Sequence, residues 1–480
     1  MIIQSVWQKS FDFSKKTVVV EPSGAQLSSD AGLLPIRQFD AAIGMTDQFV
    51  DALTDLRYQP SVRHSLREMV RSRVFGILAD YADQNDHDLL RSDPVFKLIA
   101  GRSVDADDLA SQPTLSRFEN AIDVKSLLRL QDVVMDQFIA SFDEPPKQLT
   151  FDIDPFDDPT YGQQQLTFFH GYYGQYQYLP RAITCAENDI VVMICLLFGT
   201  AHPALGAEDD LEYLVKRLRK VWPDVQILLR ADSGFGVPKM YTICERLQID
   251  YTIGIGMNPT LKKCSEPLLE ECIEEFDKEG QTQRKFCDCW YKAGSWPAQR
   301  WVVIKCEVNS QGTNRRAVVT NRPGAFVLPG AAYDAYADRG ESENRNKELK
   351  CGLQSDRLSD HRYMANLFRL NMHVLAYNLL ARLRQVVVDP LPESHAAEIP
   401  NEALDGSKRR QHHNRRRQHD PLGRGQPGTW RTRLIKVAAR ITESSRRVLV
   451  ELSGNWPFLD HYRHVSDRVL AFSATLLDSS

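Results

Sequence analysis

The order of secondary structure predicted between residues 149 and 256 constrains the fold of this chain more than any other feature. Residues 149–154 alternate apolar and polar side chains, as in a half-buried strand, whereas residues 225–231 are a mostly apolar run typical of a central strand. The predicted elements are strands at 149–154, 165–178 and 182–196, a helix at 208–220, a strand at 225–231, a helix at 238–247 and a strand at 250–256. Three strands followed by alternating helices and strands predict a five-stranded mixed α/β sheet.

Two of these strands end in acidic residues. Asp152 and Asp154 project from the same face of the first strand, which Pro155 ends. Asp232 follows the central strand, at the carboxyl end where open α/β sheets bind ligands. For Asp232 the alternative is a capping role at the next helix. Asp152 is expected to face solvent, with a fallback role as a ligand.

A third carboxylate lies in the charged segment 336–350. Read as a helix, this segment places four residues on one face, at offsets of three, four and seven: Tyr336, Arg339, Glu343 and Lys350. A carboxylate between two cations suits a divalent metal ion beside the phosphates of a nucleic acid. The alternative is a solvated helix of mixed charge.

The three carboxylates Asp154, Asp232 and Glu343 could together bind two divalent metal ions and cleave a phosphodiester. With the Tyr-(2)-Arg-(3)-Glu-(6)-Lys spacing of segment 336–350, they resemble the DDE transposases of bacterial insertion sequences. The chain looks similar to the insertion-sequence 1380 family in particular, at residues 28–34, 81–88, 112–120, 162–164, 170–173, 230–235 and 444–448. One departure is that Pro155 follows Asp154, where the family usually has a small residue, so Asp152 stays an alternative ligand.

The resemblance implies a mechanism and its partners. The three carboxylates would bind two Mg²⁺ ions, for which Mn²⁺ can substitute. Water and then the released 3′-hydroxyl would attack DNA, at the transposon ends and in the target. Three further residues are expected to bind the DNA backbone near the cleaved end: Tyr336, Arg339 and Lys350. A homodimer is expected because two ends must be cut together.

The predicted order of strands and helices is that of an RNase H-like core, which organises the rest of the chain. The predicted domains are a mostly helical DNA-binding and dimerisation domain at 1–145, an RNase H-like core at 146–257 and 331–390, a β-rich insertion at 258–330, and a basic loop with a helical C-terminal region at 391–480. Further expected elements are a strand at 17–20, insertion strands at 283–292, 300–308 and 315–320, and helices at 63–81, 124–141, 360–388 and 430–453.

The predicted insertion is rich in tryptophan, with Trp290, Trp296 and Trp301 close together. A base flipped out of the DNA stack can be held on an aromatic face. Trp296 follows Gly-Ser and precedes Pro, so it is the most loop-like of the three and the one expected to contact DNA. The alternative is that these side chains fill the core of the insertion.

Charge is unevenly distributed along the chain. The net charge is −4, but residues 408–447 hold thirteen Lys and Arg against only Asp420 and Glu443. Such clusters bind phosphates through counterion release. The residues expected to bind DNA in this way are Arg409, Arg410, Arg415, Arg416 and Arg417. A solvated basic linker is the alternative.

The composition argues against a membrane protein, a secreted protein and a zinc-binding protein. No run of apolar residues is long enough for a transmembrane helix and no signal peptide is recognisable, so a cytoplasmic protein without membrane contact is expected. The nine cysteines include no Cys-x-x-Cys pair, which argues against a structural zinc site. Two other functions fit the sequence: a catalytically silent relative that only binds DNA, and an RNase H-type nuclease without strand transfer. Inverted repeats flanking the reading frame would distinguish them from a transposase.

Overall fold

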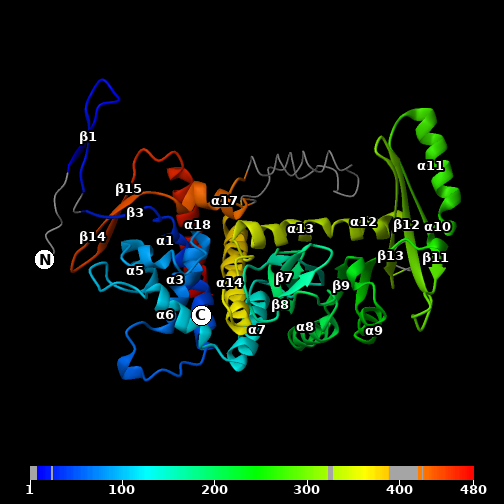
Figure 1. Cartoon of the computed structure of the whole chain (residues 1–480), viewed down its shortest axis with the longest axis horizontal. Helices are drawn as coiled ribbons and strands as arrows, with labels where there is room; N and C mark the ends of the chain where they lie inside the picture. Colours follow the sequence, from blue (N-terminus) through cyan, green and yellow to red (C-terminus); the bar gives the residue numbers. More distant parts are fainter. Residues whose placement is uncertain (1–7, 23–24, 323–327, 389–419, 424, 480) are drawn as a thin grey trace.

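The computed structural model of the protein describes residues 8–22, 25–322, 328–388, 420–423 and 425–479. The molecule is elongated (Figure 1): helices from both ends of the chain form one side, a mixed sheet occupies the middle, and strands with one long helix form the other side. No helix within these residues is long and apolar enough to cross a membrane.

β4 (Gln148–Pro155) lies at the centre of the sheet. It pairs in parallel with β9 (Gln226–Ala231) and antiparallel with β7 (Gln175–Cys185). β10 (Asp250–Ile255) continues in parallel from β9, and β8 (Val191–Phe198) pairs antiparallel with β7. The resulting order β8-β7-β4-β9-β10 confirms a mixed sheet, but in the described residues these five strands are part of a ten-stranded sheet. The parallel strands are largely buried, as expected where both faces are covered.

Two helices between these strands match the prediction. α8 (Ala207–Val221) and α9 (Pro238–Arg246) lie close to the expected bounds. α8 buries residues at i, i+3, i+4 and i+7, namely Leu211, Leu214, Val215 and Leu218. This apolar stripe faces the core and leaves the charged face to solvent.

The hairpin after β4 differs from the prediction. The sequence predicted a turn between 178 and 182, but β7 runs without a break through Pro180, and a short loop precedes β8. Pro180 is tolerated here because it faces the chain just beyond the end of β4. Its carbonyl accepts from the Phe156 N–H, and the N–H that proline lacks has no β4 partner to lose at this position. Two short strands also pair with β7: β5 (Asp158–Pro159) and β6 (Phe168–His170).

The region predicted as a β-rich insertion extends the central sheet. Its three strands were predicted: β11 (Gln283–Tyr291), β12 (Arg300–Asn309) and β13 (Gly312–Thr320). β13 pairs antiparallel with β10, so these strands are continuous with the core sheet. The helices α10 (Pro259–Cys264) and α11 (Glu266–Glu279) were not predicted; α11 packs on β11 and β12.

The segment expected to be one continuous helix is broken. α12 (Pro329–Ala337) ends before Arg339, α13 (Gly340–Lys347) begins immediately after it, and a π-helical turn follows at Glu348–Gly352. Arg339 lies in the turn between the two helices, where its N–H donates to the Tyr336 carbonyl. Gly340 favours a break here because glycine has a low helix propensity.

The N-terminal region is helical, as predicted. Its helices are α1 (Leu33–Ile43), α2 (Met45–Asp51), α3 (Leu66–Leu78), α4 (His87–Leu90), α5 (Pro94–Ala100), α6 (Gln112–Asn120) and α7 (Val124–Ile139). The long α14 (Tyr363–Val387) packs against α3 and β8 and so joins this region to the sheet. Glu119 of α6 makes buried ion pairs with Arg73 of α3 and Arg369 of α14, which fixes the joint.

The prediction of a helix at 430–453 was wrong. Only α17 (Pro427–Trp430) and a π turn (Arg431–Ile435) are helical; β14 (Ala439–Glu443) and β15 (Val448–Leu452) form a hairpin. β14 also pairs with β3 (Gln26–Ser28), and this long-range contact outweighs the helical spacing of the basic residues. The chain ends in α18 (Leu459–Ser479), which packs on α1. At the other end β1 (Lys9–Phe11) and the predicted β2 (Val18–Val20) form a separate ribbon.

Candidate active site

Asp154 lies near the carboxyl end of β4, and its side chain is largely buried. Its carboxylate accepts hydrogen bonds from Arg339 Nη1 at 3.1 Å and from Ser342 Oγ at 3.2 Å. The pKa of Asp154 is raised to about 7, mainly because the side chain is buried; Arg339 opposes this effect, and the carboxylates of Asp232 and Glu343 add to it. Burial therefore disfavours the charged form of Asp154 in the free protein.

Asp232 follows β9 directly. Its Oδ1 accepts the N–H of Gly234 at 2.9 Å, so it caps the short 3₁₀ turn Ser233–Phe235. The same carboxylate acts electrostatically on Asp154 and Arg339. The capping role and the place beside Asp154 thus occur together, and one does not exclude the other.

Glu343 lies on α13, next to Arg339. Its side chain is 68% exposed, and Arg339 Nη2 lies 3.3 Å from its Oε1. The Arg339 guanidinium therefore pairs with Asp154 and Glu343 simultaneously, while Asp232 also acts on it. Three acidic residues that are far apart in the sequence are gathered around one arginine.

Carboxylate oxygens are the donors that Mg²⁺ prefers, and three acidic residues lie around one arginine here, so the donor chemistry fits a hard divalent cation. The carboxylates do not, however, form a ready-made cage around one point. Among the described residues, no group of three or more His, Cys, Asp or Glu side chains is arranged to hold a metal ion. Arg339 bridges Asp154 and Glu343 instead.

Tyr336 and Lys350 flank this cluster. The Tyr336 ring centroid lies 5.8 Å from the Arg339 guanidinium, and a Cβ added at Gly254 would lie only 2.8 Å from its hydroxyl. Lys350 Nζ pairs with Asp157 Oδ1 at 2.6 Å, three residues beyond Asp154. The four residues expected on one helical face therefore converge on the ends of the central strands, although the helix itself is broken.

Asp152 does not face solvent, contrary to the expectation. It is 1% exposed, and both of its oxygens accept from Arg230, at 2.7 and 2.8 Å. Arg345 Nη1 adds a third bond at 3.0 Å, and Arg345 also pairs with Asp189. A carboxylate held by two arginines is already compensated, which disfavours the fallback role of Asp152 as a metal ligand.

Arg230 and Arg345 were not predicted from the sequence, although their spacing was visible. Asp152, Arg230 and Arg345 each lie two residues from one of the three candidate catalytic acids. Residues two apart in a strand lie on the same face. The ion pair between Asp152 of β4 and Arg230 of β9 therefore joins the two strands next to Asp154 and Asp232. Arg345 ties α13 to the same point. We name these three residues the buried ion network.

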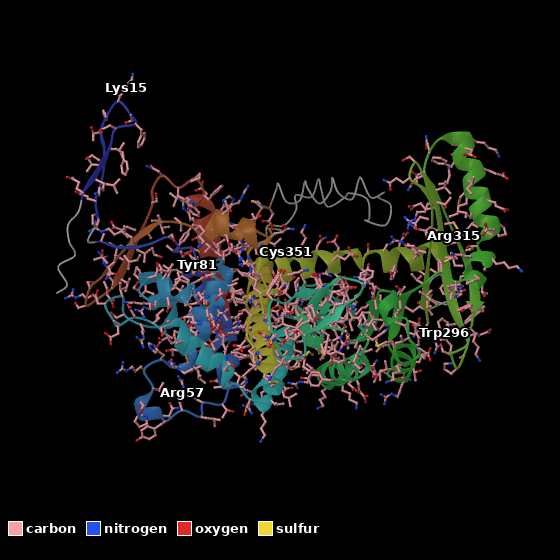
Figure 2. All side chains as sticks on the ribbon, viewed as in Figure 1. Lys15, Arg57, Tyr81, Trp296, Arg315 and Cys351 are labelled. Carbon is pink, nitrogen blue, oxygen red and sulfur yellow. The ribbon has the colours of Figure 1, made fainter. Side chains whose placement is uncertain are left out.

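The structure also contradicts the expected exposure of Trp296. The residue lies in the loop between β11 and β12, as predicted, in the region of α9 and these strands (Figure 2), but it is only 4% exposed. Its ring packs on Tyr241 and Tyr291, and Arg300 lies over it. The core-filling alternative therefore holds for Trp296, because the loop folds back onto α9. Trp290 is the exposed tryptophan of this region.

The basic cluster is only partly visible. Arg409, Arg410, Arg415, Arg416 and Arg417 lie outside the described residues. Two cations of the described part have structural roles. Arg431 donates to the carbonyls of Ile77 and Leu78 and pairs with Asp80, and Lys436 pairs with Asp30. The cluster as read from the sequence therefore mixes structural cations with candidate DNA contacts.

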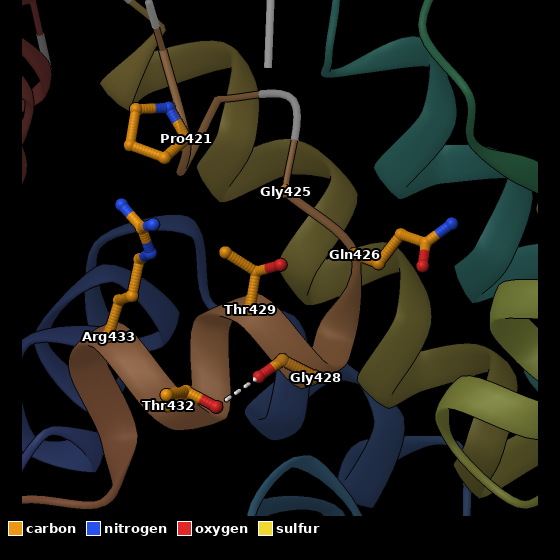
Figure 3. Close-up of a pocket in the computed structure, with 7 residues that line it drawn as sticks. All are labelled: Pro421, Gly425, Gln426, Gly428, Thr429, Thr432 and Arg433. Atoms are coloured by element: carbon orange, nitrogen blue, oxygen red, sulfur yellow. Dashed lines mark hydrogen bonds between the residues drawn. The ribbon is translucent and has the colours of Figure 1, made fainter. Parts of the chain in front are cut away.

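A hollow of about 410 Å³ lies at α17 (Figure 3). Its lining residues are Pro421, Gly425, Gln426, Gly428, Thr429, Thr432 and Arg433. Thr432 Oγ1 donates to the Gly428 carbonyl at 2.9 Å, an intrahelical bond that leaves its hydroxyl engaged. None of the three candidate catalytic acids lines this hollow, so it is not part of the site described above.

Comparisons with known proteins identify the family of the chain. The model of the family described as transposase DDE domain, group 1, matches residues 11–399. No protein of curated function matches the chain. A solved structure of a piggyBac transposase synaptic complex with hairpin DNA is 13% identical, with 84% of each chain covered and a TM-score of 0.40. The family match spans most of the sequence, and the chain therefore belongs to the transposase DDE domain family, group 1.

Proposed function

We propose that this protein is a transposase that cuts and joins DNA at the ends of an insertion sequence, with Asp154, Asp232 and Glu343 as its catalytic carboxylates. The observation that carries this proposal is their convergence. Asp154 and Glu343 pair with the same arginine, Arg339. Asp232 lies close enough to raise the pKa of both Arg339 and Asp154. Membership of the DDE transposase domain family supports the same choice of residues.

The strand order supports an RNase H-like core. Three strands (β4, β7 and β8) precede α8, and β9, α9 and β10 follow it. In space the order is β8-β7-β4-β9-β10, with the first strand in the middle. The first two candidate acids then lie at the ends of neighbouring parallel strands. We place the chain in the branch with the Tyr-Arg-Glu-Lys signature and in the insertion-sequence 1380 family, on the motifs given above.

The three carboxylates would hold two Mg²⁺ ions, or Mn²⁺ in their place. Divalent ions bound there would activate the attacking oxygen and stabilise the leaving oxygen of a phosphodiester. The side chains around the carboxylates would bind the DNA backbone. Arg339 partly compensates the charge of the carboxylates in the free protein and supplies a planar, bidentate partner for a phosphate. Lys350 and Tyr336 would position the same backbone from either side.

Partners follow from this activity. The substrate is DNA at the transposon ends and in the target. A homodimer is proposed because both ends must be cut in one event. The helical region 1–145 would contact the transposon ends and join the two copies of the protein. Trp296 is buried, so it would not contact DNA directly.

Replacing Asp154 with Asn tests the site against its buried neighbour. We expect cleavage of DNA to be lost, with little change in the thermal unfolding midpoint, because burial already disfavours the charged form of this side chain. Asp152→Ala should do the opposite. It leaves Arg230 and Arg345 buried without their shared partner, at a cost of about 3–5 kcal/mol, and should lower cleavage only partly while the protein stays folded. The reverse ranking in a cleavage assay with melting curves would make Asp152 the ligand.

Neutralising Arg409, Arg410, Arg415, Arg416 and Arg417 tests the basic cluster. If these residues bind phosphates without reading sequence, affinity should fall equally for end DNA and random DNA. The slope of log affinity against log salt should shrink by roughly 0.9 for each phosphate that the variant no longer neutralises. Salt titrations of the wild type and the five-fold variant on both DNAs measure it. An unchanged slope would make the segment a linker, and a loss of affinity confined to end DNA would place sequence readout there.

A further inference from the structure

A hairpin next to the acidic site presents aromatic rings to solvent. We name residues 168–176, from β6 to the start of β7, the aromatic hairpin. Exposed rings of this hairpin, and of the segment leading into it, belong to Tyr161, Phe168, Phe169, Tyr172, Tyr173 and Tyr176. Exposed aromatic side chains that gather in one segment are typical of binding surfaces. The catalytic role proposed above does not use any of these rings.

Most of the ring contacts lie within the hairpin itself, and Phe168 also packs on Phe198 of β8. Phe169 and Tyr176 lie opposite each other in the strand register, with ring centroids 5.6 Å apart. Tyr172 and Tyr173 form an edge-to-face pair at 5.0 Å in the turn that joins the strands. Tyr172 is 87% exposed, and a Cβ added at the neighbouring Gly171 would meet no atom within 4 Å. The turn therefore projects freely into solvent.

This turn lies beside the catalytic carboxylates. Gln175 donates to Asp157, the residue that also holds Lys350. The pKa of the Tyr173 phenol is raised by burial and by Asp157, with further contributions from Asp154 and Asp232. A strand that is cut at Asp154 and Asp232 would thus pass within reach of the hairpin.

The composition of the hairpin indicates which part of a DNA strand it fits. Residues 159–180 contain no Asp, Glu, Lys or Arg, so this stretch offers no charge for a phosphate. It offers aromatic faces, with glutamine side chains such as Gln163 and Gln175 among them. Any base can stack on an aromatic ring. A phosphate instead needs a cation, and the nearby cations are Arg339 and Lys350.

We propose that the aromatic hairpin binds unpaired bases of the DNA strand next to the phosphodiester that is cut. The inference rests on the proposed function, since it takes its ligand from the reaction at the neighbouring carboxylates. A base next to the cut that leaves the duplex stack would then stack on the exposed rings of Tyr172 and Tyr173. The hairpin is then a site for bases, and Arg339 and Lys350 form a separate site for the backbone.

The test compares two DNA probes in the absence of divalent metal, so that no cleavage enters the measurement. One probe is a duplex with a short single-stranded end of thymidines, and the other has the same end with abasic sugars in their place. The wild-type protein should bind the first at least about ten-fold more tightly by fluorescence anisotropy. Tyr172→Ala with Tyr173→Ala should abolish that preference and leave affinity for the abasic probe unchanged.

Two controls separate stacking from other roles. Tyr172→Phe with Tyr173→Phe should keep the preference because stacking needs the ring and not the hydroxyl. Tyr58→Ala removes an exposed aromatic ring from the N-terminal region and should also keep it. Retention of the preference in the double alanine variant would overturn the proposal. So would an unchanged preference accompanied by altered self-association in sedimentation, which would make the hairpin an interface between copies.

Failure of the hairpin and failure of the proposed function give different results. Asp232→Asn should bind both probes as the wild type does, because the hairpin is intact. A wild-type protein that cleaves DNA but shows no base preference would refute only the hairpin site. A base preference in a protein whose cleavage survives Asp232→Asn would instead refute the catalytic assignment.

Discussion

Replacing Asp232 with Asn, or Glu343 with Gln, is expected to lower the rate of DNA cleavage at least about 1000-fold, which corresponds to about 4 kcal/mol. Each change keeps the size of the side chain and removes one negative charge from the site around Arg339. Glu343 is mostly exposed, so its replacement should not affect folding. Affinity for DNA in the absence of divalent metal should stay the same or rise, because less negative charge then faces the phosphates. Cleavage under single-turnover conditions and anisotropy titrations measure the two effects.

Two neighbouring acids serve as matched controls. Glu341→Gln alters the same helix two residues away, and Asp224→Asn alters an exposed residue just before β9. Both proteins should cleave at the wild-type rate. Calorimetric titration with Mg²⁺ should show weakened binding for Asp232→Asn and Glu343→Gln but not for the controls. Cleavage by either site variant at ordinary Mg²⁺ would remove that residue from the catalytic set.

The sheet and its acidic residues could be predicted because their signals are local. The alternation before Asp154 and the apolar run before Asp232 each specify a strand and its end, and the structure has β4 and β9 at these places. Strand order then places the two ends side by side. The spacing from Tyr336 to Lys350 also indicated side chains that lie close together, even though the helix that carries them is broken at Arg339.

The parts that could not be predicted depend on long-range contacts. Nothing near Asp152 in the sequence shows that Arg230 and Arg345 will reach it. β14 is a strand because β3, about four hundred residues earlier, pairs with it. Trp296 looks like a loop residue and lies in a loop, but the loop is folded against Tyr241. The sequence predicted one strand at 165–178, whereas the structure has a turn between β6 and β7, and only the structure shows which of the aromatic rings are exposed.

Replacing Arg345 with Met is expected to destabilise the protein by about 3–5 kcal/mol, as much as the loss of Asp152. Arg345 is buried and bonds to Asp152 and Asp189, so its loss leaves the Asp152 carboxylate with Arg230 alone. Arg345→Lys should be milder, because it keeps the charge but cannot form the same forked pair of bonds. The unfolding midpoints in urea and on heating measure the loss of stability. Arg217→Met is the matched control: Arg217 pairs with Asp136 at a more exposed position, where about 1 kcal/mol or less is expected.

The double variant Asp152→Asn, Arg345→Met separates this network from simple loss of packing. If the two residues act through one another, the double variant should lose less stability than the two single variants together, with a coupling of about 1–3 kcal/mol. Additive losses would mean that each side chain acts alone. The coupling also has a consequence for catalysis, since Arg345 fixes α13 and α13 carries Glu343. Cleavage by the folded Arg345→Met protein should therefore fall at low temperature, well below its midpoint, because Glu343 is no longer held against the strands that carry Asp154 and Asp232.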